Sequence, residues 1–178
     1  MKNLKFITKT TFILILCMVL SSQTKLFSQG ETWTWHFGGG GANPGMQLKF
    51  PSLATSLSQI RSNEPAASIS DAAGNLLFYT DGMTVWNQLH AVMPNGTGLF
   101  GSQSTTQGAM IIKQPGSATL YYIFTIAASG MPDGLRYSIV DMSLDAGKGA
   151  VTATKNVLMR TPSTEKLTAV RHCNNVDV

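Results

Sequence analysis

Acidic, basic and aromatic side chains stand in or beside the turns that this chain is predicted to form, where they could contact a ligand. The candidates for ligand contact are Asp81, Trp86, His90, Asp133 and Arg136. An aspartate in a turn commonly accepts hydrogen bonds from the N–H groups of that turn. We expect this role for Asp71, Asp81 and Asp133, each taken singly. No residue is predicted to be catalytic.

A glycoside hydrolase needs two carboxylates a few ångström apart, one acting as acid and the other as nucleophile or base. Glu64, Glu165, Asp81 and Asp133 are present, but no local motif joins two of them. No GxSxG elbow and no DxDxDG calcium loop occurs, and residues 70–74 depart from an Asp-box in spacing and lack its tryptophan. The sequence therefore favours a protein that is not an enzyme, with a hydrolase as the alternative.

Cofactor and metal motifs are absent from the sequence as well. The glycine run at 38–41 is followed by neither GK[ST] nor a helical pattern, so we interpret it as a connector between strands. Cys17 and Cys173 form no CxxC and no cysteine–histidine spacing typical of zinc. His36, His90 and His172 fit strand or loop positions better than a ligand set. We predict no cofactor and no metal site.

The first 28 residues have the layout of a secretory signal peptide. Lys2, Lys5 and Lys9 precede an apolar run at 12–20, which is short for a membrane span. We expect cleavage between Ser28 and Gly30. An uncleaved anchor is the weaker alternative, and a lipoprotein is disfavoured because a leucine precedes Cys17.

Removal of this segment changes the charge of the protein. The whole chain has 13 basic and 9 acidic residues, and the first 28 residues hold four lysines and no acid. Nine basic and nine acidic residues then remain (13 − 4 against 9), so the mature chain is close to neutral. We predict no nucleic-acid partner, because no basic patch is left to bind phosphates.

The central part of the chain predicts short strands joined by tight turns. Strands are expected at 67–70, 76–80, 83–86 and 90–93, with Asp71 and Asp81-Gly82 in the turns and a loop at 94–98. A second group is expected at 109–113, 120–126, 135–141 and 150–159. Upstream strands are expected at 32–37 and 46–50, followed by a loop over 52–65.

The first strands of successive units begin at Ala67, Ala109 and Ala169, which are 42 and 60 residues apart (109 − 67 and 169 − 109). Four strands per repeat of this length are typical of propeller blades. We therefore predict an all-β fold of antiparallel four-stranded repeats forming a partial β-propeller, with a β-sandwich as the alternative. The predicted units are a signal peptide at 1–28, N-terminal strands and a glycine-rich connector at 29–65, a first blade at 66–107, a second at 108–165, and the start of a truncated third at 166–178.

Several blocks resemble the N-terminal region of large exported proteins of the Bacteroidota. They are SISDAAGNLLFYTDGMTVWN, VMPNGTGL, LYYIFTI, GLRYSIVDMSLDAG and TEKLTAVRH, in this order, within a match from Trp33 to His172. The resemblance implies a β-propeller-like domain in proteins that often end in a gliding-motility-associated or type IX secretion sorting domain. The chain continues into neither further blades nor a sorting domain, so we expect a truncated product or fragment, with an open sheet edge and marginal stability in isolation.

These observations predict an exported cell-surface or secreted binding or structural module, belonging to a larger adhesin-like or gliding-associated protein. A propeller enzyme with an incomplete catalytic part is the alternative. The expected partner is a surface glycan or a protein, with no membrane span in the mature chain. The type IX secretion machinery would be a partner only of a longer form that carries a sorting domain.

We expect the protein to be exported through the inner membrane. Full-length relatives would be located on the outer-membrane surface or outside the cell, and the short form, if it is real, would be located in the periplasm. Exposed tryptophans could stack on sugar rings, and Trp86, beside Asn87 at a strand end, is the one singled out.

Overall fold

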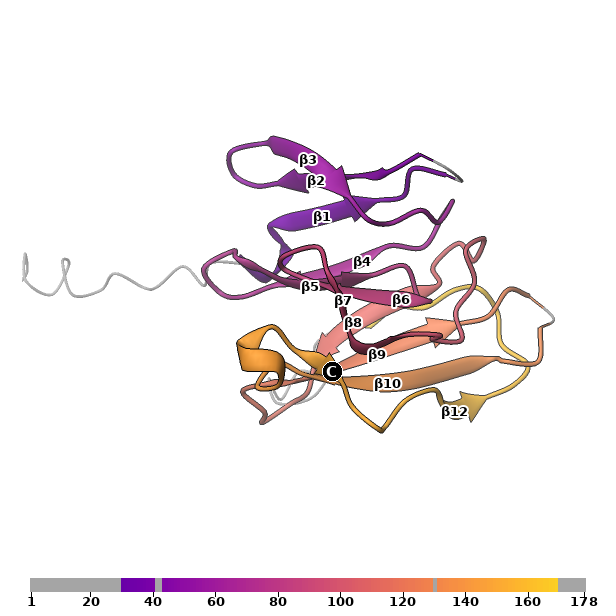
Figure 1. Cartoon of the computed structure of the whole chain (residues 1–178). Helices are drawn as coiled ribbons and strands as arrows, with labels where there is room; N and C mark the ends of the chain where they lie inside the picture. The colour runs from indigo at the N-terminus through magenta and orange to yellow at the C-terminus, as the bar shows by residue number, and fades with distance from the viewer. Residues whose placement is uncertain (1–29, 41–42, 130, 170–178) are drawn as a thin grey trace, which may run out of the picture.

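The protein is a stack of three antiparallel β-sheets (Figure 1). The computed structural model describes residues 30–40, 43–129 and 131–169. Within these residues the regular elements are strands and two short 3₁₀ turns, η1 (Gly30–Thr32) and η2 (Asp145–Gly147). The prediction of an all-β, antiparallel protein is confirmed. The sheets have three, four and five strands, and none of them closes into a barrel within the described part of the chain.

The first sheet contains β1 (Thr34–Phe37), β2 (Gly45–Lys49) and β3 (Ala54–Ser58), in that order. The prediction of a loop over 52–65 was wrong at β3, which pairs with β2 from Gly45–Ser58 to Lys49–Ala54. The sequence of β3, ATSLS, is polar because this edge strand is exposed along most of its length. Its pairing therefore depends on the backbone ladder more than on apolar burial.

The middle sheet contains β4 (Ala67–Ser70), β5 (Leu76–Thr80), β6 (Thr84–Asn87) and β7 (Val92–Thr97). Asp71 closes the first turn by accepting hydrogen bonds from the N–H groups of Ala73 and Asn75. In the same turn Gly74 has φ of +80° and lies against the Trp33 ring, which leaves no room for a side chain.

The strand β7 extends through Pro94 and Gly96, so the loop predicted at 94–98 was wrong for most of its length. A proline is compatible with this strand because β7 is the edge of its sheet, where a missing N–H need not break the ladder. Asn95 has φ of +56°, and the pairing of β6 with β7 shifts register between Thr84 and Trp86. Turn-forming residues therefore stand inside an irregular edge strand.

The third sheet contains β8 (Ala109–Lys113), β9 (Leu120–Ile126), β10 (Leu135–Asp141), β11 (Ala150–Val151) and β12 (Val157–Arg160). The single strand predicted at 150–159 is divided in two, and both parts pair with β10. Between them Asn156 has φ of +55°, and Lys155 donates hydrogen bonds to the Asn95 and Thr97 carbonyls. Because of these contacts, the strand is interrupted between β11 and β12.

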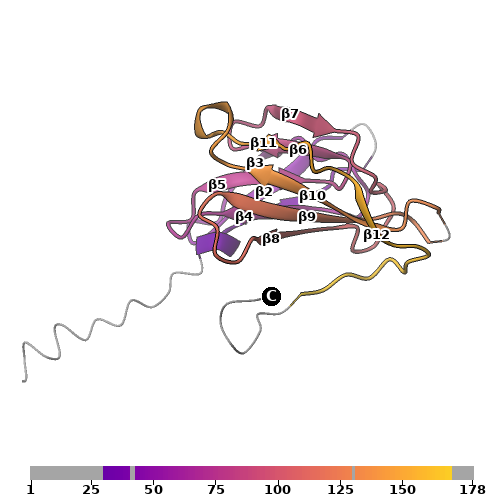
Figure 2. The ribbon, with the colours of Figure 1, turned by 90° about the horizontal axis from the view of Figure 1, so that it is seen from below.

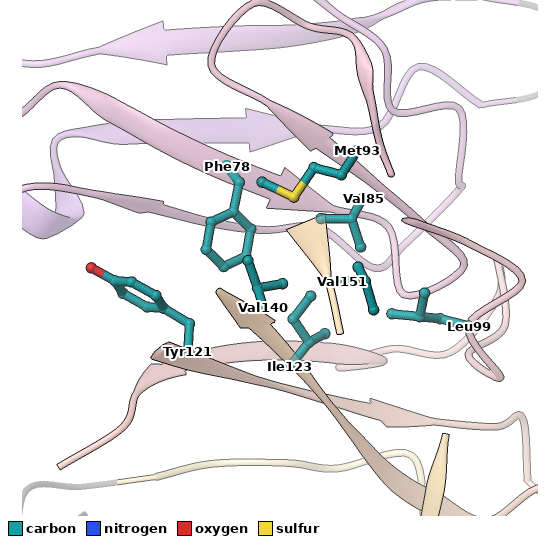
Figure 3. Close-up of a cluster of buried hydrophobic side chains, with 8 residues drawn as sticks. All are labelled: Phe78, Val85, Met93, Leu99, Tyr121, Ile123, Val140 and Val151. Atoms are coloured by element: carbon teal, nitrogen blue, oxygen red, sulfur yellow. The ribbon is translucent and has the colours of Figure 1, made fainter. Parts of the chain in front are cut away.

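The middle sheet is buried on both faces, as successive side chains of one strand show. Phe78 points toward the third sheet and meets Tyr121 edge-on at 5.5 Å, whereas Tyr79 points toward the first sheet. Figure 3 shows the cluster between the middle and third sheets, where apolar side chains from both converge. Its members are Phe78, Val85, Met93, Leu99, Tyr121, Ile123, Val140 and Val151.

The predicted units correspond to this stack as follows. The range 66–107 holds β4–β7, the range 108–165 holds β8–β12, and the N-terminal range 29–65 forms a sheet of its own. Four strands per unit therefore describe only the middle sheet. No strand occurs at 166–169, the described part of the predicted third blade, and residues 1–29 and 170–178 lie outside the described residues.

Candidate functional site

A cleft of about 300 Å³ lies where one edge strand of each sheet meets the others. Within their sheets β1, β4 and β8 each pair on one side only, and β4 lies beside both of the others. The cleft has no aspartate, glutamate, lysine or arginine in its wall. Its lining residues are Thr32, Thr34, Trp35, His36, Ala66, Ala67, Ser68, Ala109, Met110 and Ile111.

Two buried polar atoms in the wall of the cleft have no hydrogen-bond partner among the described residues. They are Thr34 Oγ1 and His36 Nε2, on side chains that are 2% and 6% exposed. Alternation along β1 places both side chains on the inner face of the first sheet. A buried polar group without a partner is costly. A ligand whose polar groups reached these atoms through a small shift of the wall would therefore offset that cost.

Trp35 stands at the rim of the cleft and is 52% exposed. Its indole Nε1 donates a hydrogen bond of 2.7 Å to the Thr32 carbonyl, and its ring lies 6.4 Å from that of Phe37. These contacts hold an aromatic surface in a fixed orientation. The electron-rich face of such a ring attracts groups with partial positive charge, which include the C–H bonds on one face of a sugar.

His36 is held from behind by an aromatic cluster between the first and middle sheets. Its ring stacks on Tyr79 at 3.9 Å, and Trp86 stacks on Tyr79 at 5.4 Å. His36 Nδ1 lies 2.9 Å from the Ser58 hydroxyl, so Nε2 is the ring nitrogen left for a ligand. Burial, and then the charge of His90, lower the pKa of His36 to about 3. At neutral pH the imidazole is therefore uncharged.

None of the five predicted ligand contacts lines this cleft. Asp81 is buried, and its Oδ1 accepts hydrogen bonds from the N–H groups of Met83 and Thr84 at 2.9 and 2.8 Å. Burial raises the pKa of Asp81, while the hydrogen bonds from Thr84 and Met83 oppose that rise. The turn-capping role expected of Asp81, like that of Asp71, is present in the structure.

Two of the other candidates lie together in the aromatic cluster. Trp86 is the second-to-last residue of β6 and is only 9% exposed. His90 adopts φ of +61°, and its Nδ1 lies 3.0 Å from the Tyr79 hydroxyl. Burial raises the pKa of Tyr79 to about 12, although hydrogen bonds from Gln59 and Ser58 lower it. The neutral phenol remains a hydrogen-bonding partner for His90 at all ordinary pH values.

Asp133 lies in the turn before β10, and Arg136 is the second residue of that strand. Their charged groups are 3.7 Å apart. Arg136 also donates hydrogen bonds to the Asp133 and Asn156 carbonyls, and its guanidinium lies 5.0 Å from the centre of the Phe100 ring. The arginine thereby joins three segments of the chain. Among the described residues no backbone N–H donates to the Asp133 side chain, which is half exposed.

Two carboxylates share a second cavity of about 260 Å³, lined by Glu31 and Asp71 together with Lys113 and Tyr121. Burial, and then the negative charges of Glu31 and Asp71, raise the pKa of Tyr121. Although burial raises the pKa of Asp71, hydrogen bonds from Asn75 and from two neighbouring N–H groups bring it below its ordinary value. A general acid requires a raised pKa, so Asp71 is not suited to that role.

Within the described residues no group of three or more histidine, cysteine, aspartate or glutamate side chains could hold a metal ion. Glu165 is used structurally, since it accepts a 2.8 Å hydrogen bond from the Ser129 N–H. Hydrogen bonds from the Ser129 and Thr106 N–H groups lower the pKa of Glu165.

Sequence reasoning missed Thr34 and His36 and preferred the wrong tryptophan as the accessible one. In the sequence of residues 34–37, alternation puts Thr34 and His36 on one face of the strand and Trp35 on the other. The structure shows that the face of Thr34 and His36 is the buried one. Trp33 precedes β1 and packs near Gly74 instead of continuing the face of Trp35. Which of these faces meets the cleft depends on the packing of β1 beside β4, a contact that no local pattern encodes.

Among the described residues no helix is long and apolar enough to cross a membrane. Comparison of the chain with protein-family models, with curated proteins and with solved structures finds no match.

Proposed function

We propose that this chain is an exported surface or secreted module that binds a neutral, sugar-containing ligand in the cleft between β1, β4 and β8. The observation that carries the proposal is the combination of an exposed, oriented Trp35 with the unpartnered Thr34 Oγ1 and His36 Nε2 in an uncharged wall. An aromatic platform beside buried hydrogen-bonding atoms matches a sugar ring, which has a C–H face and hydroxyl edges.

The chemistry of the wall restricts the ligand. A phosphate or carboxylate would find no lysine or arginine in the wall, and a cation would find no carboxylate. The volume is at the lower end of that of small-molecule sites, so we expect one sugar residue or chain end to enter. The signal-like N-terminus and the resemblance to exported Bacteroidota proteins support display outside the cytoplasm, on a partial β-propeller frame.

A glycan array probed with the labelled protein tests the proposal. Trp35→Ala should reduce binding to the best glycan about tenfold, because loss of an aromatic contact costs roughly 1.5 kcal/mol. Thr34→Val, which removes the hydroxyl and keeps the shape, should reduce binding about fivefold. Leu89→Ala is the matched control, since Leu89 is 68% exposed in the turn before β7. Equal binding by all three variants, or binding confined to charged glycans, would refute the proposal.

A further inference from the structure

The first and third sheets are the two ends of the stack (Figure 1). Each carries a group of apolar side chains on its outer side, which we call the front face and the back face. They lie on opposite ends of the molecule, so one chain cannot cover its own faces by closing them together. From their composition and extent we propose that copies of this chain associate front to back, the first sheet of one copy packing on the third sheet of the next.

The front face is the outer side of the first sheet. Register pairs Trp35 with Leu48, Phe37 with Met46, and Met46 with Leu57, so that these five side chains lie together on that side. Trp35, Phe37, Met46 and Leu57 are 52%, 41%, 46% and 70% exposed. No charged side chain lies among them. Trp35 also stands at the rim of the cleft, so a ligand bound there and a second copy on the front face would compete for its ring.

The back face is the outer side of the third sheet. Three rings pack on one another there: Tyr122 lies 5.9 Å from Phe124 and 5.8 Å from Tyr137, and Phe124 lies 6.4 Å from Tyr137. The register of β8, β9 and β10 adds apolar neighbours on the same side. They are Met110, Ile112, Leu120, Leu135 and Ile139, all of them partly exposed. The same register puts Asp141 opposite Leu120 and Arg160 opposite Leu135, so charged side chains stand at the two ends of the face.

The segment after β12 covers only one end of the back face. It forms a cavity with Ile126 and Leu135 and is held beside the start of β8, where the Gln107 N–H donates to the Glu165 carbonyl. Figure 2, which looks at the stack from below, shows β8, β9 and β10 with this segment passing beside them. The three rings at the centre of the face, Tyr122, Phe124 and Tyr137, are partly exposed.

The exposed apolar area of the front face agrees with that of an interface. With about 200 Å² for a large apolar side chain, the exposed fractions of its four outermost residues amount to roughly 400 Å². A standard interface buries roughly 800 Å² on each partner, a little over half of it apolar. The front face therefore supplies about the apolar area that one side of such an interface contains.

The two sheet–sheet contacts inside the chain indicate why another copy is a suitable occupant. Both contacts join a sheet face rich in aromatic or β-branched residues to a neighbouring sheet, as with Phe78 on Tyr121 and Tyr79 on His36. Front on back would continue the stack in the same direction, with Phe37 and Met46 facing the rings of Tyr122 and Tyr137. Such contacts are heterologous, meaning that each joins two different surfaces.

Two single variants test this arrangement. Leu57→Glu places a charge on the front face and Tyr137→Glu places one on the back face. Each contact needs one intact front and one intact back, so either variant alone should be monomeric. Their equimolar mixture should contain a heterodimer, formed by the intact back of one and the intact front of the other.

The measurement is light scattering after size exclusion at about 100 µM, well above a micromolar dissociation constant. The unmodified protein and the control Leu89→Glu should show at least twice the monomer mass. If Tyr137→Glu fails to fold, Val157→Glu, on a 37% exposed residue that pairs with Tyr137, replaces it. A monomeric unmodified protein would overturn the proposal. So would a back-face variant that still dimerises with itself, because this would indicate front-to-front pairing. A mixture that remains monomeric would overturn it as well.

Discussion

Acidification should destabilise the protein through His36. The pKa of this histidine is lowered from 6.5 to about 3, first by burial and then by the charge of His90. A histidine that is neutral in the folded state contributes stability above its unfolded pKa, and that stability falls as the pH falls toward the folded pKa. The window is therefore pH 6.5 down to about 3.

The magnitude follows from proton linkage. Each pH unit below 6.5 costs about 1.4 kcal/mol while the folded state excludes the proton that the unfolded state binds. At pH 4.5 the free energy of unfolding should be lower than at pH 7 by about 2.7 kcal/mol. Hydrogen bonds lower the pKa values of Asp71, Asp141 and Glu165, so the stability that these carboxylates contribute is lost mainly below this pH.

Urea denaturation at pH 7.0 and 4.5, followed by tryptophan emission, measures the effect. His36→Phe keeps an aromatic ring on Tyr79 and removes the titrating group, so most of the pH-dependent loss should disappear. His90→Gln is the companion variant, because His90 faces the same cluster and hydrogen-bonds to Tyr79. Should His36→Phe lose as much stability as the unmodified protein between the two pH values, the assignment of the effect to His36 is wrong.

Two further changes test the packing of the sheets. Gly74→Ala should lower the free energy of unfolding by more than 1 kcal/mol, measured by urea denaturation, because the residue has positive φ and faces the Trp33 ring; an unchanged midpoint would contradict the close approach. Ile123→Ala, at a fully buried position between the middle and third sheets, should cost about 2–5 kcal/mol. The conservative variant Ile123→Val should cost about 1 kcal/mol, and equal costs for the two would contradict tight packing there.

Most strands could be predicted from the sequence because their turns carry strong local signals. Asp71 and Asp81 each accept N–H groups of their own turns, so the chemistry that marks the turn is the chemistry that forms it. Where a strand depends on pairing alone, prediction failed. β3 has a polar sequence and is held by β2. β12 is separated from β11 by the contacts of Lys155 with β7 and of Asn156 with the loop after β7.

The candidate site could not be predicted for a related reason. The alternation of Thr34, Trp35 and His36 shows that successive side chains have opposite directions. It does not show that β1 lies beside β4, or that three free strand edges meet there. Trp86 is similar in local sequence to an exposed strand-end aromatic. It packs with Tyr79 and with Ile60, which lies in the segment between β3 and β4, and only the tertiary structure reveals this contact.

The most direct test of ligand binding in the cleft is a fluorescence titration of the best array glycan into the unmodified protein and Trp35→Phe. The protein has three tryptophans, and only Trp35 combines high exposure with a place at the rim of the cleft. We predict a saturable change of emission in the unmodified protein that is lost in Trp35→Phe, while calorimetry still detects binding within about tenfold of the original affinity. The same emission change in Trp35→Phe would place the ligand away from the cleft and contradict the proposed site, and the absence of any array glycan that binds would contradict the proposed function.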